Sequence, residues 1–461
     1  MRLSTLIGPD LKEVLREDPE QVRELFSELH PEDVADILGE LEPDEAATFL
    51  SHLPAEEAAP IFERLEEHEQ EEIVEVMPPE SVVQIASEME PDDRADLFSA
   101  LPEEVGDALL ERLERVDPEA AEEVREIEKW PETSAGHLMT TAYVHLPQIL
   151  SVRDAVEAVR TFDKESDAPI YNVYVLEREK LLGIVPLREL VLREPTTKLS
   201  DIMREPVVTV HPTMDQEEVA KQMAKYDLNV VPVVDDKHVL LGVITIDDIV
   251  DVLTQEQTED VQKLGGVQPL EEGYFQTSFW AFIRKRGVVL VILFIEEFFT
   301  QTAMRHYDWV LDAIKGAAYY VPLLISTGGN SGGQSSTLII RGLATGEIRP
   351  RDWWRILFRE LGMGLALGSG LGFIGMLRVK MYPDQSWTFA FTVAATLVGI
   401  VVMGCTVGSM MPLLLKRIGI DPATSSAPFI ASLVDVLGII IFVHVAKILM
   451  SHVIAAAAIP H

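Results

Sequence analysis

Long runs of apolar residues fill the C-terminal part of the chain. They span residues 288–304, 317–340, 356–376, 389–415 and 428–450. About 20 apolar residues in a helix cross the roughly 30 Å of hydrocarbon in a bilayer, and the small residues in or beside each run favour close helix packing. The pattern predicts a five-helix α transmembrane bundle within residues 271–461.

The N-terminal part has a shorter and more polar rhythm. Between about residue 20 and residue 128, proline recurs before acidic or small residues and then apolar positions, as in HPEDVADIL, EPDEAATFL, EPDDRADLF and LPEEVGDALL. Proline suits the first turn of a helix, and acids there interact favourably with the helix dipole. Units of about a dozen residues that bury apolar faces only against their neighbours predict an α-helical superhelix over residues 1–130.

Residues 131–254 alternate amphipathic helical segments with short β-branched runs. The helical segments are SVRDAVEAVRTF and DQEEVAKQMAKY, and LLGIVPLREL and LLGVITIDDI mark two copies of one unit. This pattern resembles tandem α/β cystathionine-β-synthase (CBS) domains at residues 131–200 and 201–254. The resemblance implies an adenosine-nucleotide site at Thr245 and Asp248 of the second copy, whereas the first copy has Pro186 and Glu189 at the matching positions.

A connecting helix is predicted over residues 247–270. Its acidic residues fall within about half of the helical circumference, while Ile249, Val250, Val252 and Leu253 mostly take the other side. A solvated connector would carry the same acidic stripe. The alternative is a helix held away from other acidic domains by repulsion unless cations fill the gap.

The charge of the chain divides at the same place. Residues 1–270 hold 64 acidic and 23 basic residues, net −41, and residues 271–461 hold 12 acidic and 15 basic residues, net +3. A strongly acidic surface repels nucleic acid and attracts cations, so we expect no nucleic-acid partner. The single cysteine, Cys405, excludes an intramolecular disulfide framework.

Basic residues predict how the bundle is oriented. They precede the first apolar run at residues 284–286, cluster between the second and third at residues 341–359, and follow the fourth at Lys416 and Arg417. Loops rich in Lys and Arg remain cytoplasmic. We therefore expect a multi-pass protein of the plasma (inner) membrane, with the N-terminal domains in the cytosol and the C-terminus outside.

Asp435 is the most informative residue of the apolar part, because it lies near the middle of the last run. Carboxylates at bilayer depth are costly and mark ion or proton routes. Its neighbours on one helical face, Ala431, Ser432 and Gly438, are small. The second run contains the small and polar stretch 328–337, which is unsuited to lipid and suited to water or another backbone.

The order of these parts resembles the MgtE family of magnesium channels and transporters. The resemblance rests most on VPLLISTGGNSGGQSSTLIIRGLATGEI and on the Asp435 helix that follows IDPATSSAPF. It implies Mg²⁺ influx through a homodimer, with Asp435 binding a hydrated ion and with Asn330, Ala431, Ser432 and Gly438 lining the pore. The helix over residues 247–270 then becomes a plug helix.

The resemblance also implies that intracellular Mg²⁺ closes the channel by bridging acidic residues. Both the transported and the regulatory ligand would be Mg²⁺, and ATP or a related nucleotide is a further ligand of the CBS pair. We assign Asp248 to the ion rather than to the nucleotide. The implied ligands are Asp92, Asp96, Asp215, Glu217, Asp227, Asp248, Asp251, Glu256, Glu259, Asp260 and Asp421.

Three alternatives stay open. Instead of a magnesium channel, the protein could be an exchanger of divalent cations for protons or sodium, a nucleotide sensor with a membrane anchor, or an intramembrane hydrolase. We expect no enzyme, because no ATPase motif is present. A hydrolase would also need a second catalytic carboxylate on a span facing Asp435, and Glu296 and Glu297 are expected towards the outer end of the first span. Cys405 and His444 are predicted to be packing residues, and Ala427 stands where the family pattern predicts Asn.

Overall fold

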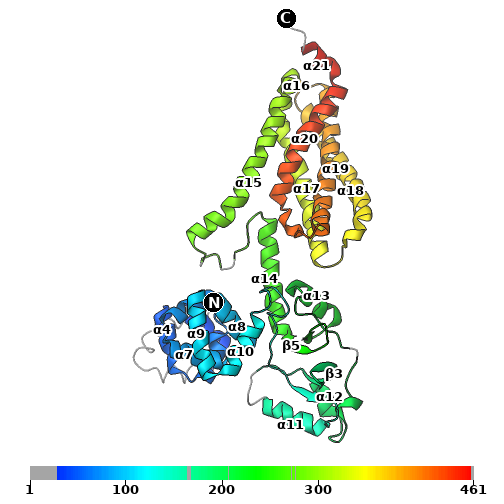
Figure 1. Ribbon diagram of the computed structural model, residues 1–461. Coiled ribbons are helices and arrows are strands. Elements are labelled where there is room, and N and C mark those ends of the chain that lie inside the picture. Colours follow the sequence, from blue (N-terminus) through cyan, green and yellow to red (C-terminus); the bar gives the residue numbers. More distant parts are fainter. Residues whose placement is uncertain (1–28, 163–167, 206, 271–272, 276, 458–461) are drawn as a thin grey trace. The chain divides into compact units, whose positions relative to one another are not determined.

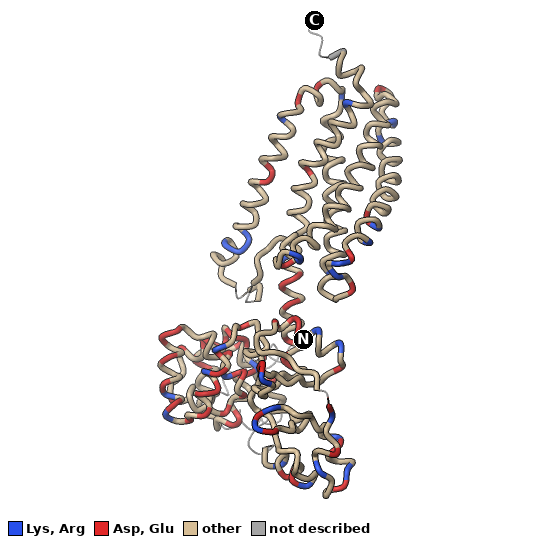
Figure 2. The backbone as a smooth tube through the Cα atoms, turned by 45° about the vertical axis from the view of Figure 1, so that its right-hand side comes forward, with Lys and Arg blue, Asp and Glu red and all other residues tan. Residues whose placement is uncertain are grey.

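The computed structural model describes residues 29–162, 168–205, 207–270, 273–275 and 277–457 (Figure 1). The chain forms two compact units, residues 1–254 and 255–461, and each is described by itself. Acidic residues occur along much of the first unit, whereas the long helices of the second unit carry few charged residues between their ends (Figure 2). The part of the predicted superhelix before residue 29 lies outside the described residues.

From residue 29 onward, the described part of the first unit opens with eight short helices. Those that start directly at a proline are α3 (Pro31–Leu38), α4 (Pro43–His52), α7 (Pro79–Glu88), α8 (Pro91–Ala100) and α10 (Pro118–Ile127). The others are α5 (Ala55–Phe62), α6 (Glu67–Val76) and α9 (Glu103–Val116), of which α5 and α9 directly follow Pro54 and Pro102. The predicted starts are therefore confirmed.

These helices pack in a stepwise manner. Each of α3 to α8 contacts the helix two positions further along the chain, so that one apolar face is buried by neighbours in sequence. Phe49, Phe62 and Leu113 are almost wholly buried in the resulting core. This is the superhelical stacking that the repeated pattern predicts.

Two α/β modules follow within the same unit. The first contains β1 (His145–Pro147), α11 (Val152–Phe162), β2 (Asn172–Glu177), β3 (Lys180–Pro186), α12 (Leu187–Leu192) and η1 (Leu199–Asp201). The second contains α13 (Gln216–Tyr226), β4 (Val230–Val234), β5 (Leu240–Thr245) and the start of α14 (Ile246–Leu264).

The strands of each module form a small sheet. Strand β2 pairs with β1 in parallel and with β3 in antiparallel fashion, and β4 pairs with β5 in antiparallel fashion. Val173 and Val185 are register partners and both are fully buried, as expected for strands covered by helices. The two-copy α/β prediction is confirmed.

The second unit is helical. Its five long helices are α15 (Phe279–His306), α17 (Val321–Ala344), α18 (Trp353–Lys380), α19 (Trp387–Arg417) and α20 (Ala427–Leu449). Short connecting elements are α16 (Asp308–Ala313), η2 (Ala317–Tyr319), η3 (Pro350–Asp352), η4 (Pro422–Thr424) and α21 (Ser451–Ala457).

Helix α17 differs from the other four long helices. By length and composition, α15, α18, α19 and α20 are suited to cross a membrane, whereas the Gly, Ser, Asn and Gln residues of α17 make it less apolar. Helix α17 instead packs against both α19 and α20. One of the five predicted spans, α17, is therefore suited to contact with other helices rather than with lipid.

Glycines let α17 and α19 approach each other closely. A Cβ added at Gly404 of α19 would lie 2.6 Å from the carbonyl oxygen of Gly328 in α17. A Cβ added at Gly329 would lie 3.0 Å from the Cβ of Ala431 in α20. The small residues predicted to allow close packing are thus at the helix contacts.

Candidate functional site

A cluster of acidic residues joins the helical repeat to the start of α14 in the first unit. Asp92 and Asp93 occupy the first turn of α8, where Pro91 starts the helix, and Glu90 precedes them. Asp247 and Asp248 occupy the first turn of α14, directly after β5. Asp248 interacts electrostatically with Glu90, Asp92 and Asp93.

Arg94 fixes the position of α8 in this cluster. Its guanidinium group is buried and donates to the carbonyl oxygens of Ala86 at 2.6 Å and Met89 at 2.6 Å, and to Glu123 at 2.9 Å. The backbone N–H of Glu90 donates to Glu63 at 2.7 Å. These contacts fix α8 and Glu90 within the helical repeat.

Burial raises the pKa of four acids in the cluster, and the negative charges of neighbouring acids raise it further. Burial, then the charges of neighbouring acids, raise the pKa of Glu90 to about 7 and that of Asp93 to about 8. Burial raises the pKa of Asp248 to about 6 against its hydrogen bonds from Thr245, and it raises that of Asp92 well above its usual range.

The carboxylate of Asp92 also lacks a hydrogen-bond partner at one buried oxygen, Oδ1. Hard cations such as Mg²⁺ bind oxygen ligands and would relieve both the repulsion and the unsatisfied oxygen. Sequence reasoning identified Asp92 and Asp248 but missed Glu63, Glu90 and Asp93. The EPDD sequence at the start of α8 is the signal that would have found Glu90 and Asp93.

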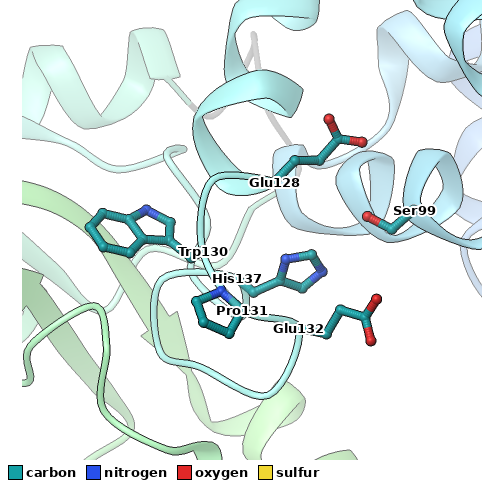
Figure 3. A pocket seen from close by; sticks show the side chains of 6 residues that line it. All are labelled: Ser99, Glu128, Trp130, Pro131, Glu132 and His137. Carbon is teal, nitrogen blue, oxygen red and sulfur yellow. The ribbon is translucent and has the colours of Figure 1, made fainter.

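Asp96 has a different environment from Asp92. It is exposed, and one of its carboxylate oxygens lies 3.1 Å from Nε2 of His137. The pKa of His137 is raised, chiefly by this hydrogen bond. Ser99, Glu128, Trp130, Pro131, Glu132 and His137 line an adjoining open hollow (Figure 3). Asp96 therefore contacts an imidazole rather than α14.

The three predicted acids of the second α/β module lie at the two ends of α13. Asp215 caps the start of the helix by accepting from the backbone N–H of Glu217 at 3.0 Å. Glu217 pairs with Lys221 at 2.7 Å. Asp227 ends the helix in the left-handed conformation, with φ 52°. Within one chain the structure does not bring Asp227 together with the other two.

The later acids of α14 belong to two different settings. Asp251 is exposed and near Asp247, and burial is the main cause of its raised pKa. Lys263 forms ion pairs with Glu259 and with Asp421, the latter at 2.6 Å, so the second unit joins α14 to the loop before α20. Glu256 and Asp260 are half-buried on the same helix, and each takes part in polar or electrostatic interactions.

The predicted nucleotide residues already contact each other. Oδ2 of Asp248 accepts from the hydroxyl of Thr245 at 2.6 Å and from its backbone N–H at 3.3 Å. Gly242 lies close to the backbone of Thr140, where a Cβ would come within 2.7 Å of the Thr140 carbonyl oxygen. Asp248 is thus shared between this turn and the acidic cluster.

The predicted pore residues differ in exposure. Asp435 and Ala431 are half-buried on α20, and Asn330 of α17 is exposed. Ser432 and Gly438 are buried in the chain, with Gly438 directed at Ile325 and Ile400. Ala427, at the position predicted to carry Asn, faces Gly333. The pore-lining roles remain predictions.

Two acids of α15 lie beside α20. Helices α15 and α20 pack side by side in the second unit (Figure 1). Glu296 is hydrogen-bonded to Ser432, and Glu297 interacts electrostatically with Asp435. The pairing of α15 with α20 thus brings both acids beside the part of α20 that carries Asp435, which their predicted place towards the outer end of the first span did not suggest.

Cys405 is part of a buried polar group. Its thiol is hydrogen-bonded to Ser335 of α17, and the Ser335 hydroxyl donates to the buried carboxylate of Glu360 at 2.7 Å. These contacts join α17, α18 and α19. Cys405 is thus a packing residue, as predicted, but one within a hydrogen-bonded group that sequence spacing did not reveal.

Among the residues that the structure describes, no three His, Cys, Asp or Glu side chains are grouped so as to hold a metal ion between them. The carboxylates of the cluster around α8 and α14 are therefore further apart than the direct ligands of a single metal ion would be. An ion retaining part of its water shell, as Mg²⁺ commonly does, suits such spacing.

A bundle of apolar helices with an acid at bilayer depth, attached to acidic helical and CBS-type modules, defines a membrane transport protein for cations. A family model described as a divalent cation transporter matches residues 321–445. The MgtE intracellular N domain matches residues 29–133, and a CBS domain matches residues 199–255.

Known proteins give the same result. The magnesium transporter MgtE of Thermus thermophilus is 41% identical over 332 residues, which cover 72% of this chain and 73% of that protein. The corresponding protein of Enterococcus faecalis is 30% identical over 335 residues, 72% of each chain. A crystal structure of the soluble part of a magnesium transporter has a TM-score of 0.51 and 30% identity, covering 55% of this chain and 99% of that one. The chain belongs to the MgtE family of divalent cation transporters.

Proposed function

We propose that this protein is a magnesium channel that admits Mg²⁺ across the plasma membrane and closes when cytosolic Mg²⁺ binds its acidic residues. The observation that carries the proposal is the cluster in which Asp92 and Asp93 of α8 meet Asp248 of α14. The names of the relatives support Mg²⁺ as the transported ion.

Asp435 is the ion-binding group of the pathway. Mg²⁺ is usually held by one or two carboxylates together with retained waters. In a homodimer with a two-fold axis, two Asp435 side chains would face one pathway, with Asn330 and the backbone around Ala431 contacting the water shell. The membrane potential favours entry of a divalent ion by about 4.6 kcal/mol per 100 mV, so passive influx needs no pump.

Gating follows from the electrostatics of the cytosolic half. When Mg²⁺ is scarce, the ionised acids around α8 and α14 repel one another and favour separation of the helical repeat from α14. When Mg²⁺ is abundant, ions between these acids favour the compact arrangement. A change from 1:99 to 99:1 requires about 5.5 kcal/mol, which several weak sites together supply.

The other predicted ligands extend this network. Asp96, Asp215, Glu217 and Asp227 serve as weaker sites, and the plug-helix acids with Asp421 act near the pore. Lys263 already neutralises Glu259 and Asp421 in part. Mg²⁺ at these two positions therefore competes with a bound lysine.

A second candidate function is binding of an adenosine nucleotide at the second CBS copy. The hydrogen bonds from Thr245 to Asp248 favour it, because they form the turn in which the family contacts a ribose. A nucleotide hydroxyl and an ion would both need Asp248. The proposal therefore predicts that nucleotide and Mg²⁺ binding at Asp248 influence each other.

Single-channel recording in a planar bilayer tests the proposed function. With Mg²⁺ as the only permeant cation and no proton or sodium gradient, we expect discrete openings that become rarer as Mg²⁺ rises on the cytosolic side. Asp435→Asn should abolish the currents, whereas the same change at exposed Asp384, in the turn between α18 and α19, should not. Currents that require a proton or sodium gradient would instead identify an exchanger.

A further inference from the structure

The membrane half contains a second acidic position beside Asp435, on a different helix. Glu296 and Glu297 are adjacent on α15, which packs against α20, and each interacts with one of two residues that lie one helical turn apart on α20. Glu296 is hydrogen-bonded to Ser432, and Glu297 interacts with Asp435. A carboxylate at bilayer depth is costly and is retained where it serves an ion route.

Two polar atoms on the same face of α15 are buried without a hydrogen-bond partner within the chain. Oε2 of Glu296 is buried without a hydrogen-bond partner. Thr300, one turn further along α15, is only 6% exposed, and its hydroxyl also has no partner. Buried polar groups are normally hydrogen-bonded. Thr302, by contrast, donates to the carbonyl oxygen of Phe298 at 2.6 Å.

Exposure distinguishes the roles of the two acids. Glu297 is exposed in the single chain, whereas Glu296 is half-buried against α20. Glu297 is thus free to meet an ion that approaches Asp435, and Glu296 holds the two helices in register through Ser432. The unpartnered hydroxyl of Thr300 and oxygen of Glu296 offer acceptors to the water shell of such an ion.

We propose that Glu297 is a second ion-binding and specificity-determining residue of the pathway, so that each chain supplies two carboxylates, Glu297 and Asp435, to a partly hydrated divalent cation. This inference rests on the proposed function, because it assumes that Asp435 binds the transported ion. A second carboxylate attracts a divalent ion twice as strongly as a monovalent one at the same distance. Glu297 therefore favours divalent over monovalent cations.

Mg²⁺ influx into liposomes containing the full chain, followed with a fluorescent magnesium indicator, tests the inference. Glu297→Gln should reduce influx about tenfold and make it more sensitive to competing Na⁺, because half of the fixed negative charge is lost. Glu297→Asp should restore most of the influx. Thr300→Val should weaken it, and the matched Thr302→Val should not.

The two proposals fail in different ways. Wild-type influx and Na⁺ sensitivity in Glu297→Gln, together with loss of influx in Asp435→Asn, would overturn the role of Glu297 and leave the proposed function intact. Full influx in Asp435→Asn would overturn the proposed function itself.

A second measurement avoids the question of whether the variants fold. In the wild-type protein, a hydrophobic carbodiimide should modify Glu297, and Mg²⁺ should protect it, while modification of exposed Glu347 should not depend on Mg²⁺. Modification of Glu297 that is unaffected by Mg²⁺ would overturn the inference.

Discussion

Replacing Asp248 by Asn should close the cytosolic half in the absence of Mg²⁺. Burial raises the pKa of Asp248 from 3.8 to about 6, so keeping its carboxylate ionised in the compact arrangement costs about 3 kcal/mol. The neutral amide avoids this cost, and its oxygen can still accept the hydrogen bond from Thr245. The compact arrangement should therefore gain up to about 3 kcal/mol at pH 7.5.

Limited proteolysis of the full-length protein measures this effect, because cleavage follows the population of the open form when opening is fast. Without Mg²⁺, cleavage of Asp248→Asn should be slower by up to about a hundredfold. At saturating Mg²⁺ the difference should shrink, because the variant has also lost a ligand. Asp44→Asn removes the same charge from an exposed first-turn position of α4 and should change little.

Faster Mg²⁺-free cleavage of Asp248→Asn, or cleavage equal to that of the wild type, would refute the electrostatic reasoning. Either result would mean that burying the ionised carboxylate of Asp248 does not oppose the compact arrangement.

The remaining predictions concern pH, helix packing and the plug helix. The pKa values of Asp248, Glu90 and Asp93 are raised to about 6, 7 and 8, so the Mg²⁺-free compact form should lose stability as pH rises from about 4, and the loss should be complete above about 8. The Mg²⁺ affinity of the compact form should rise as these acids ionise, with proton release. Calorimetry showing a pH-independent affinity would contradict this. Gly404→Ala should lower the thermal unfolding temperature, because its Cβ would lie 2.6 Å from the Gly328 carbonyl oxygen. Gly362→Ala is the control, because nothing lies within 4 Å of a Cβ at that position. Equal unfolding temperatures of the two variants would contradict the close packing of α17 and α19. Lys263→Met should raise the Mg²⁺ affinity near the pore several-fold by freeing Glu259 and Asp421, and calorimetry showing no gain would argue against competition.

Much of the fold follows from local sequence. Pro31, Pro43, Pro79, Pro91 and Pro118 each start a helix, because proline fits the first helical turn and cannot continue a preceding one. The two copies of the α/β module follow from alternating periods of hydrophobicity. The small-residue run of α17 correctly indicated contact with another backbone rather than with lipid.

The candidate site was predictable only in part, because sequence spacing gives the face of a helix but not the helix that it meets. Asp92 and Asp248 were expected, whereas Glu90 and Asp93 join them through the packing of α8. Glu296 and Glu297 were expected only to lie towards the outer end of the first span, whereas the pairing of α15 with α20 brings them beside Ser432 and Asp435. The ion pair of Asp96 with His137 likewise depends on tertiary structure.

The most direct test of the central claim is Mg²⁺ influx into liposomes that contain either the wild-type chain or Asp435→Asn, matched for amount and folding. If Asp435 binds the transported ion, the wild type should carry Mg²⁺ along its gradient and the variant should show only background leakage. Equal influx through both proteins would contradict the account.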